Sequence, residues 1–315
     1  MLKVHILNVG HGDCIIVEFP SGNLTMVDIN RASYMDIESL AEVMYELNAA
    51  AVTNVEAALL KEGMITLDSV LEKRGYDIKL TDPLKYMADV FPRLTLFRFI
   101  STHPHMDHIT GLRALKDKLG FLNAWVLKTG FDADLSEATE SQEQDWGLYK
   151  NLREDNVQYV TVVRPLEGSQ NNFWQQDGIH ILSPNSKLLS EAVKHNDTSY
   201  VLLIQYGLTK VILGGDAEQK TWNYIYDTWK KTDVLKGVTL LKASHHGRDT
   251  GYYEDAVKMM RPKATVLSVG KKPENDAHQK YKKYSTDVFS TRWRGTMKFY
   301  LDDQGGGSYD AEYDR

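Results

Sequence analysis

Residues 102–108 read Thr-His-Pro-His-Met-Asp-His, and they follow the apolar run at 96–100. Three histidines and one aspartate therefore lie within six residues. A buried strand that ends in a tight loop directs such side chains into one cavity, and neutral imidazole and carboxylate are ligands that Zn²⁺ prefers. A solvated loop with incidental histidines is the alternative, but it gives no reason for this spacing directly after a strand. The stretch predicts a metal site at a strand end.

Similar side chains follow apolar runs elsewhere in the chain. Asp28, Asp216 and the pair His245 and His246 each come shortly after a predicted strand. In layered α/β proteins, polar groups at strand ends commonly line the binding site. A single aspartate after a strand is usually a turn residue, so the argument rests on the recurrence. These residues are predicted to meet the 102–108 loop.

The hydrophobic periodicity alternates between strands and helices, which predicts layers of an α/β fold. Strands are expected at 3–9, 14–19, 24–27, 94–100, 159–163, 179–182, 200–206, 210–213, 238–243, 264–269 and 295–301, and helices at 112–119, 137–153, 222–229 and 252–260. Residues 31–94 show helical spacing and form an expected helical insertion. The glycine run at 305–307 predicts a flexible tail over 303–315. We therefore expect a single domain over residues 1–302.

Composition excludes several classes of protein. The chain has 315 residues and is 42% hydrophobic, enough for a packed core. Its single cysteine, Cys14, excludes a disulfide scaffold and a cysteine zinc finger. No stretch reaches the roughly 20 apolar residues that span a bilayer, and the start is too short and strand-like for a signal peptide. The sequence predicts a soluble, cytoplasmic protein without membrane association.

The net charge of −6 hides a basic segment late in the chain. Residues 271–300 contain eight Lys or Arg and three acidic residues, with Tyr281, Tyr284 and Trp293 interleaved. Such a segment suits phosphodiester or nucleic-acid binding, although a solvated face is an equal alternative. Arg248 follows the histidine pair and either meets an anionic substrate or lies in solvent.

The motif His-x-His-x-Asp-His resembles the main signature of the metallo-β-lactamase fold superfamily. The resemblance is strongest to the hydrolase domain of competence DNA-uptake proteins and to phosphorylcholine esterases. It is carried by Asn-Val-Gly-His-Gly-Asp-Cys at 8–14, Asn-Asp-Thr-Ser-Tyr-Val-Leu at 196–202, Leu-Gly-Gly-Asp-Ala at 213–217, His-His-Gly at 245–247 and the late motif at 268–278. It covers residues 1–30 and 95–302 and implies a four-layer αββα fold.

The resemblance also implies two divalent metal ions, zinc or alternatively manganese. His103 and His105 would bind the first ion, and Asp107 and His108 the second. Asp216 would bridge the two ions. Asp28 would orient a ligand from behind, although residues 28–30 read Asp-Ile-Asn where the superfamily usually has Asp-x-Gly.

Several positions stay open. One of His245 and His246 would complete the second site; we prefer His245, which lies nearer the strand end, but the spacing does not decide. The other would contact substrate or donate a proton. The third ligand of the first ion would be His195, although relatives often carry an asparagine where this chain has Asn196. His278 is a substrate-side candidate or an exposed histidine.

Two metal ions lower the pKa of a shared water, so no serine or cysteine nucleophile is needed. We therefore expect a phosphodiesterase or nuclease that uses a hydroxide held by both ions, with Asp107 positioning it and His246 or His278 giving the proton to the leaving group. Hydrolysis of a small ester, lactone, β-lactam or cyclic nucleotide is the second hypothesis. The third is a non-catalytic regulatory module, in which 31–94 binds a partner protein or mediates self-association.

Overall fold

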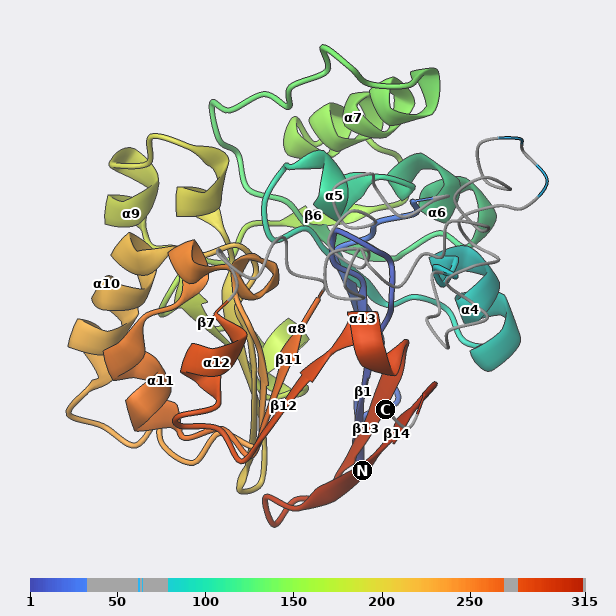
Figure 1. Ribbon diagram of the computed structural model, residues 1–315. Coiled ribbons are helices and arrows are strands. Elements are labelled where there is room, and N and C mark those ends of the chain that lie inside the picture. Colours follow the sequence, from blue (N-terminus) through green and yellow to red (C-terminus); the bar gives the residue numbers. More distant parts are fainter. Residues whose placement is uncertain (33–61, 63, 65–78, 269–276, 314–315) are drawn as a thin grey trace.

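The computed structural model describes residues 1–32, 62, 64, 79–268 and 277–313. Two β-sheets form the middle of the molecule, and helices cover the outer faces of both (Figure 1). The arrangement is the four-layer αββα fold that the sequence predicted. None of the described helices is long and apolar enough to cross a membrane.

The first sheet has eight strands and is mixed. Its strands from β14 to β3 are antiparallel to their neighbours, whereas β3 to β6 run parallel. In spatial order the strands are β14 (Gly307–Ala311), β13 (Met297–Leu301), β1 (Leu2–Ile6), β2 (Ile15–Glu18), β3 (Leu24–Val27), β4 (Arg98–Ile100), β5 (Asn123–Trp125) and β6 (Thr161–Val163).

The second sheet has six strands. Those from β12 to β9 are parallel, and β9, β8 and β7 form an antiparallel meander. The spatial order is β12 (Asp287–Ser290), β11 (Ala264–Leu267), β10 (Leu240–Lys242), β9 (Thr209–Leu213), β8 (Val201–Tyr206) and β7 (Ile179–Ser183).

The strands are apolar on both faces, which explains the four layers. In β8, Leu202 and Ile204 belong to the core between the two sheets, whereas Val201 and Leu203 belong to a second core under the helices. A third core lies on the other outer face.

The helices are α4 (Pro83–Val90), α5 (Met106–Ile109), α6 (Leu112–Lys118) and α7 (Glu140–Arg153) on the first sheet, and α8 (Asn172–Gln175), α9 (Ser186–Ser190), α10 (Gln219–Trp229), α11 (Glu254–Met260), α12 (His278–Tyr281) and α13 (Thr291–Arg294) later in the chain.

Helix starts follow local sequence signals. The α7 helix begins where the Thr139 side chain accepts the backbone N–H of Gln142 and the Gln142 side chain accepts that of Thr139, a capping box. The α4 helix begins after Asp82, whose carboxylate accepts the N–H of Leu84, with Pro83 in the first turn. These signals place the helices on the first sheet.

The C-terminal tail and two short strands differ from what the sequence predicted. The flexible tail expected at 303–315 is wrong: β14 pairs with β13 in regular antiparallel register, and Gly305 and Gly306 lie in the turn that joins them, whereas Gly307 is the first residue of β14. Most of the expected helical insertion at 31–94 lies outside the described residues, although α4 is a helix within it. The short strands β5 and β12 were not predicted.

The strand directions decide where a site can form. Within each sheet, β3 and β4, and then β9, β10 and β11, are parallel, so the carboxyl ends of each set share one edge. The β2 strand runs antiparallel to β3, with Ile15 opposite Val27, so the start of β2 lies at that edge as well. Residues that follow these strands, or precede β2, therefore gather together.

Candidate metal centre

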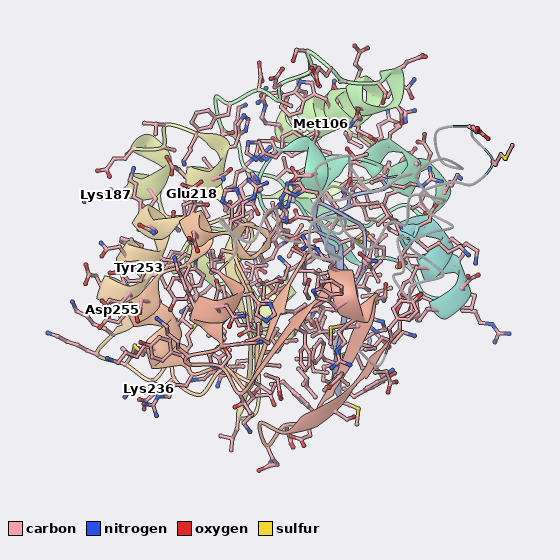
Figure 2. All side chains as sticks on the ribbon, viewed as in Figure 1. Met106, Lys187, Glu218, Lys236, Tyr253 and Asp255 are labelled. Carbon is pink, nitrogen blue, oxygen red and sulfur yellow. The ribbon has the colours of Figure 1, made fainter. Side chains whose placement is uncertain are left out.

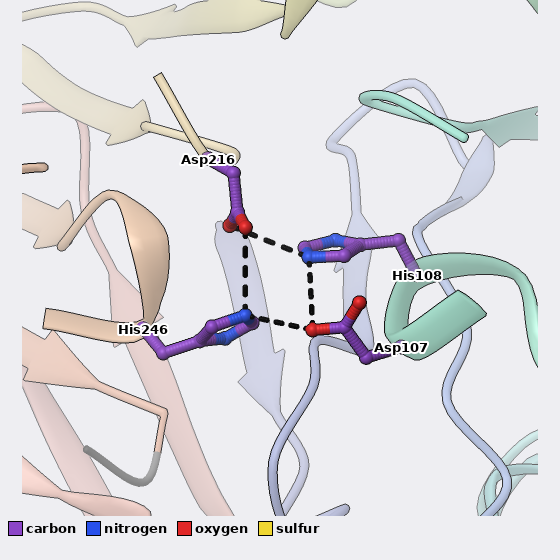
Figure 3. Close-up of side chains that lie close together, drawn as sticks. All are labelled: Asp107, His108, Asp216 and His246. Atoms are coloured by element: carbon purple, nitrogen blue, oxygen red, sulfur yellow. Dashed lines mark hydrogen bonds and ion pairs between the residues drawn. The ribbon is translucent and has the colours of Figure 1, made fainter. Parts of the chain in front are cut away.

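Four side chains from both sheets converge at this edge (Figure 3). Asp107 and His108 lie on α5, after β4; Asp216 follows β9, and His246 follows β10. The His108 Nε2 atom is 3.3 Å from Asp216 Oδ1 and 3.7 Å from Asp107 Oδ2. The His246 Nε2 atom is 3.0 Å from Asp107 Oδ2 and 3.6 Å from Asp216 Oδ2. Each imidazole therefore faces two carboxylates, and we call these four residues the aspartate-rich group.

A second group, called the histidine group, comprises His103, His105 and Asp216. The His103 Nε2 atom is 3.6 Å from Asp216 Oδ2 and 2.9 Å from His105 Nδ1. Asp216 belongs to both groups. One buried carboxylate thus lies between two sets of candidate ligands.

The loops around the site are tied to one another. In Figure 2, Met106, beside Asp107 at the start of α5, is labelled in the upper part of the molecule, and Glu218, at the N-terminal end of α10, on its left side. Glu218 accepts hydrogen bonds from Asn196 Nδ2 at 3.0 Å and from the Lys194 ammonium group. The loop before β8 is therefore attached to α10 beside the centre.

Asp28 supports His108 from behind. Its Oδ2 atom lies 2.8 Å from His108 Nδ1, and its two oxygens accept the N–H and the hydroxyl of Thr102, each at 2.7 Å. A carboxylate on Nδ1 holds the proton there and leaves the Nε2 lone pair directed at the centre. Asp28 therefore lies where it could orient His108, which is the role that the resemblance implied for it.

A second buried carboxylate, Asp13, supports His246. Its Oδ2 atom pairs with Lys242 Nζ at 2.7 Å, and its Oδ1 atom accepts the hydroxyl of Ser268. The His246 Nδ1 atom is 3.2 Å from Ser268 Oγ and 3.5 Å from Asp13 Oδ1. Because Ser268 donates to Asp13, its oxygen is available to accept from His246 Nδ1–H. The Nε2 atom is again the one directed at the centre.

Charge is balanced within the aspartate-rich group. Burial would raise the pKa of Asp107 and Asp216, but the neighbouring histidines outweigh it and hold both well below the usual carboxyl range. Burial would lower the pKa of His108 and His246, but the carboxylates raise the first well above its usual value and the second to about 9. Without metal, both histidines of the group are therefore protonated, and their two positive charges balance the two carboxylates. A bound divalent cation would supply the same charge.

The remaining atoms fit metal ligation. Burial lowers the pKa of His103 well below its usual value and that of His105 to about 4, so both imidazoles are neutral, the form that binds metals. His108 Nε2 and Asp216 Oδ1 are buried and make no hydrogen bond within the described structure. The two atoms lie 3.3 Å apart as an ion pair, and a divalent cation shared between them would take the place of the proton.

Comparison with known proteins decides the family. Residues 99–271, more than half of the chain, match the metallo-β-lactamase superfamily. The chain belongs to this superfamily. At this level it is a metal-dependent hydrolase, and the His and Asp groups described above are its candidate sites for divalent metals.

Individual relatives add detail. The chain is 30% identical over 132 residues to Recombination protein 2 of Haemophilus influenzae; the match covers 40% of this chain and 16% of that protein. A metallo hydrolase from the archaeon Ignicoccus hospitalis has a TM-score of 0.50 at 14% identity, covering 95% of this chain and all of the other. A mutant of the CmlA β-hydroxylase has a TM-score of 0.50 at 12% identity, covering 95% of this chain and 54% of that one. At such identities the two structures support the metallo-β-lactamase fold alone.

Within this superfamily site, the histidine pair is placed differently from our preference. His246, not His245, belongs to the aspartate-rich group. His245 lies at the rim: its Nε2 is 3.8 Å from Asp216 Oδ2, and its Nδ1 is 2.6 Å from the hydroxyl of Thr250. His245 lies nearer the strand end, but this did not predict the ligand because the backbone turns at this point. His245, His246 and Gly247 have left-handed φ values of 52°, 57° and 93°. The turn directs the second histidine inward.

His195 and Asn196 lie against members of the site but outside both groups. The His195 ring is 4.6 Å from that of His105, centre to centre, and its Nε2 is 3.0 Å from the carbonyl oxygen of Asp132. Asn196 Nδ2 is 3.5 Å from His245 Nε2. The role of His195 as a third ligand stays a prediction.

His278 also stays a prediction as a proton donor or substrate contact. It is the first residue of α12, outside both groups. The preceding residue, Ala277, donates its N–H to the carbonyl of Gly247 at 2.8 Å. The start of α12 is therefore attached to the turn that carries the histidine pair.

Sequence reasoning did not place Asp13, Ser268, His11 or Lys242 in this metallo-β-lactamase site. His11 Nε2 lies 3.6 Å from Asp107 Oδ2, and its ring is 4.6 Å from that of His246, centre to centre. The signal that pointed to Asp13 and His11 was the motif at 8–14, which precedes a strand instead of following one. These residues reach the site because β2 is antiparallel to β3.

Proposed function

We propose that this chain is a metal-dependent phosphodiesterase and that its substrate is nucleic acid. The observation that carries the proposal is the position of Asp216, whose carboxylate belongs to both groups of candidate ligands. When bound there, two divalent ions would lower the pKa of a shared water and stabilise negative charge on a phosphoryl oxygen. Zinc is the proposed metal, with manganese as the alternative.

The two groups divide the proposed ligands. His103 and His105 would hold one ion, and Asp107, His108 and His246 the other, with Asp216 shared. Asp28 and Asp13 keep the two buried histidines of the aspartate-rich group oriented from behind. Because these side chains are already fixed by other contacts, little reorganisation is needed on binding.

The remaining histidine of the pair takes the role that the sequence suggested for its neighbour. His245 lies at the rim, partly exposed, beside the shared carboxylate of Asp216. We propose it as the residue that meets the substrate or donates a proton to the leaving oxygen, with His278 as the second candidate. Asp107 would also orient the attacking water, because its Oδ2 atom faces the interior of the group.

Nucleic acid is favoured by the name of one relative, a recombination protein, over the matched region. The basic segment gives weaker support than its charge suggested. Lys280 is paired with Asp249 at 2.9 Å and Arg292 is buried, whereas Lys282 and Lys283 are exposed. A small ester, a lactone or a cyclic nucleotide remains the second candidate class, and partner binding through residues 31–94 the third.

A substrate panel separates these functions. Protein stripped with a chelator and reloaded with Zn²⁺ or Mn²⁺ is assayed on single-stranded DNA, duplex DNA, RNA, cyclic nucleotides, bis(4-nitrophenyl) phosphate and nitrocefin. We expect cleavage of the phosphodiesters, lost on chelation and restored by metal. Turnover of nitrocefin alone would overturn the proposal.

Substitution of the shared carboxylate tests the arrangement of the metals. Asp216→Ala should reduce phosphodiester cleavage to background and lower the number of ions bound per chain, because both groups lose a ligand. Asp287→Ala is the matched control, since that carboxylate is exposed at the start of β12, and it should leave both values unchanged. Full activity of Asp216→Ala would reject the two-metal proposal.

A further inference from the structure

Arg248 lies at the rim of the candidate metal centre. Its guanidinium donates to His11 Nε2 at 3.0 Å and approaches His245 Nε2 at 3.4 Å. His11 Nε2 is in turn 3.6 Å from Asp107 Oδ2, which belongs to the aspartate-rich group. The cationic head is therefore held beside the proposed ligands, and the side chain is partly buried.

The backbone keeps Arg248 in this position. Its N–H donates to the carbonyl of His245 at 2.9 Å, and its own carbonyl accepts the N–H of Gly251 at 3.0 Å. A Cβ atom added to Gly251 would lie 2.5 Å from the carbonyl oxygen of Ser244, so the loop closes tightly on itself. The guanidinium is consequently presented by a fixed loop.

The charge of Arg248 is not balanced by a carboxylate within the described residues. Both of its hydrogen-bonding neighbours are imidazole nitrogens and neither is a carboxylate oxygen. Asp249, the next residue in the sequence, is paired with Lys280 at 2.9 Å. The Arg248 Nε atom is buried and makes no hydrogen bond. Arginine in such a position is suited to a planar or tetrahedral anion, because its donors form a rigid fork.

We propose that Arg248 binds a non-bridging oxygen of a phosphate in the substrate and so selects phosphate esters over uncharged esters and lactones. This inference rests on the proposed function and names the substrate feature that the site recognises. The phosphate carries its charge before and during the reaction, so Arg248 contributes to binding the substrate as well as the transition state. Its loss therefore raises KM more than it lowers kcat.

The test compares Arg248→Gln with the unmodified protein, both loaded with metal. Calorimetric titration with inorganic phosphate gives a readout that does not depend on turnover. Hydrolysis of bis(4-nitrophenyl) phosphate and of uncharged 4-nitrophenyl acetate gives the second readout. We expect phosphate binding to weaken by about 10- to 100-fold, the range for a hydrogen bond to a charged group, and KM for the diester to rise by a similar factor. Any acetate hydrolysis should change less than about twofold, since that substrate offers no anion.

Two further variants make the outcome interpretable. Lys258→Gln removes an exposed positive charge on α11, outside the site and outside the basic segment 271–300, and should leave phosphate binding unchanged. Arg248→Lys keeps the charge without the fork and should retain part of the affinity. Metal content and melting temperature are measured for each variant, so that a folding defect in Arg248→Gln is recognised. In that case, the phosphate affinity of Arg248→Lys decides whether Arg248 binds the anion.

The inference fails if the unmodified protein binds no phosphate, or if Arg248→Gln binds it equally well with equal metal content. Cleavage of phosphodiesters by both proteins with the same KM would overturn it while leaving the proposed function intact. Phosphate binding that depends on Arg248, in a protein that cleaves no phosphodiester, would instead support the anion site and reject the proposed function.

Discussion

His246 receives support from two directions. Asp107 and Asp216 face its Nε2 atom, while Ser268 and Asp13 lie at its Nδ1 atom. A ring contacted at both nitrogens has one orientation, which is what a metal ligand requires. Lys242 completes the arrangement by neutralising Asp13 in the interior.

Asp13→Asn should therefore affect both stability and metal binding. Loss of one partner from the buried Asp13–Lys242 pair should cost about 3–5 kcal/mol of unfolding free energy, measured by urea denaturation. Metal affinity should fall by about 10- to 100-fold, as for other residues that orient ligands, measured by calorimetry. In Asp13→Asn/Lys242→Met, stability should recover while affinity stays low; equal recovery of both would show that Asp13 acts on stability alone.

The pKa of His246 predicts a pH dependence. It is raised to about 9 in the metal-free protein, against about 6.5 for an unfolded histidine. The resulting stability is fully present below about pH 6.5 and is lost as pH rises through about 9. Chelated protein should therefore become less stable between these values, as followed by urea unfolding. Metal affinity should rise over the same range, because the metal displaces the proton; a flat profile in both would contradict the shift.

At this scale the sequence predicted four candidate ligands on the 102–108 loop, since one short segment holds all of them. It did not separate His245 from His246, because the choice depends on three successive left-handed residues that spacing does not encode. Asp13 was missed for a different reason. The reasoning examined residues that follow strands, and Asp13 precedes one.

Among the elements, the turn after β10 has a tightly constrained backbone. Gly247 has φ of 93°, and a Cβ atom there would lie 2.3 Å from Leu267 Cδ2, on the neighbouring strand β11. Glycine is thus required twice, by the left-handed conformation and by the close approach.

Gly247→Ala should lower the unfolding free energy by more than the backbone cost alone. Gly22→Ala is the matched control, because Gly22 has φ of 90° and an added Cβ atom there would meet nothing within 4 Å. The control should lose about 1–2 kcal/mol, the cost of a left-handed alanine. The Gly247 variant should lose more and should also bind metal less tightly, measured by chemical denaturation and calorimetry. Equal losses of unfolding free energy in the two variants would show that the Leu267 side chain moves away from the added Cβ atom without an energetic cost.

The hairpin of β13 and β14 gives a second test at this scale. Tyr309 packs its ring 4.8 Å from that of Phe289 and 5.8 Å from that of Phe299, centre to centre. Truncation after Asp303 should therefore lower the melting temperature by several degrees, at about 2 °C per kcal/mol, the low end of the range for domains of 150–250 residues. Truncation after Tyr313 is the control. An unchanged melting temperature after the longer deletion would restore the flexible tail.

Most strands of the two sheets were predictable because each lies in an apolar run bounded by turn residues. Length alone does not explain why β5 and β12, with three and four residues, were missed, since β4, β6 and β10 have three residues each and lie in predicted runs. Glycines at 305–307 indicated a break in regular structure. They could not show that a further strand follows, because that depends on pairing with distant residues 297–301.

Over the whole molecule, the α/β class was predictable from the alternation of strands and helices, whereas the four-layer order and the superfamily came from the resemblance carried by the motifs. The distribution of ligands between the two sheets was not stated in advance. His103, His105, Asp107 and His108 come from the first sheet, and Asp216 and His246 from the second. The centre exists only where the sheets face one another.

This division has a consequence for the order in which the protein assembles. A chain released before β9 would contain the 102–108 loop yet lack the shared carboxylate and the inward histidine. High-affinity metal capture must then follow the docking of the two sheets, which makes it a late event during synthesis. Bound metal would in turn hold the docked sheets together, so slowed amide exchange should appear in β3 and β10 at the same time. The bound cation would therefore stabilise the two sheets in their docked arrangement.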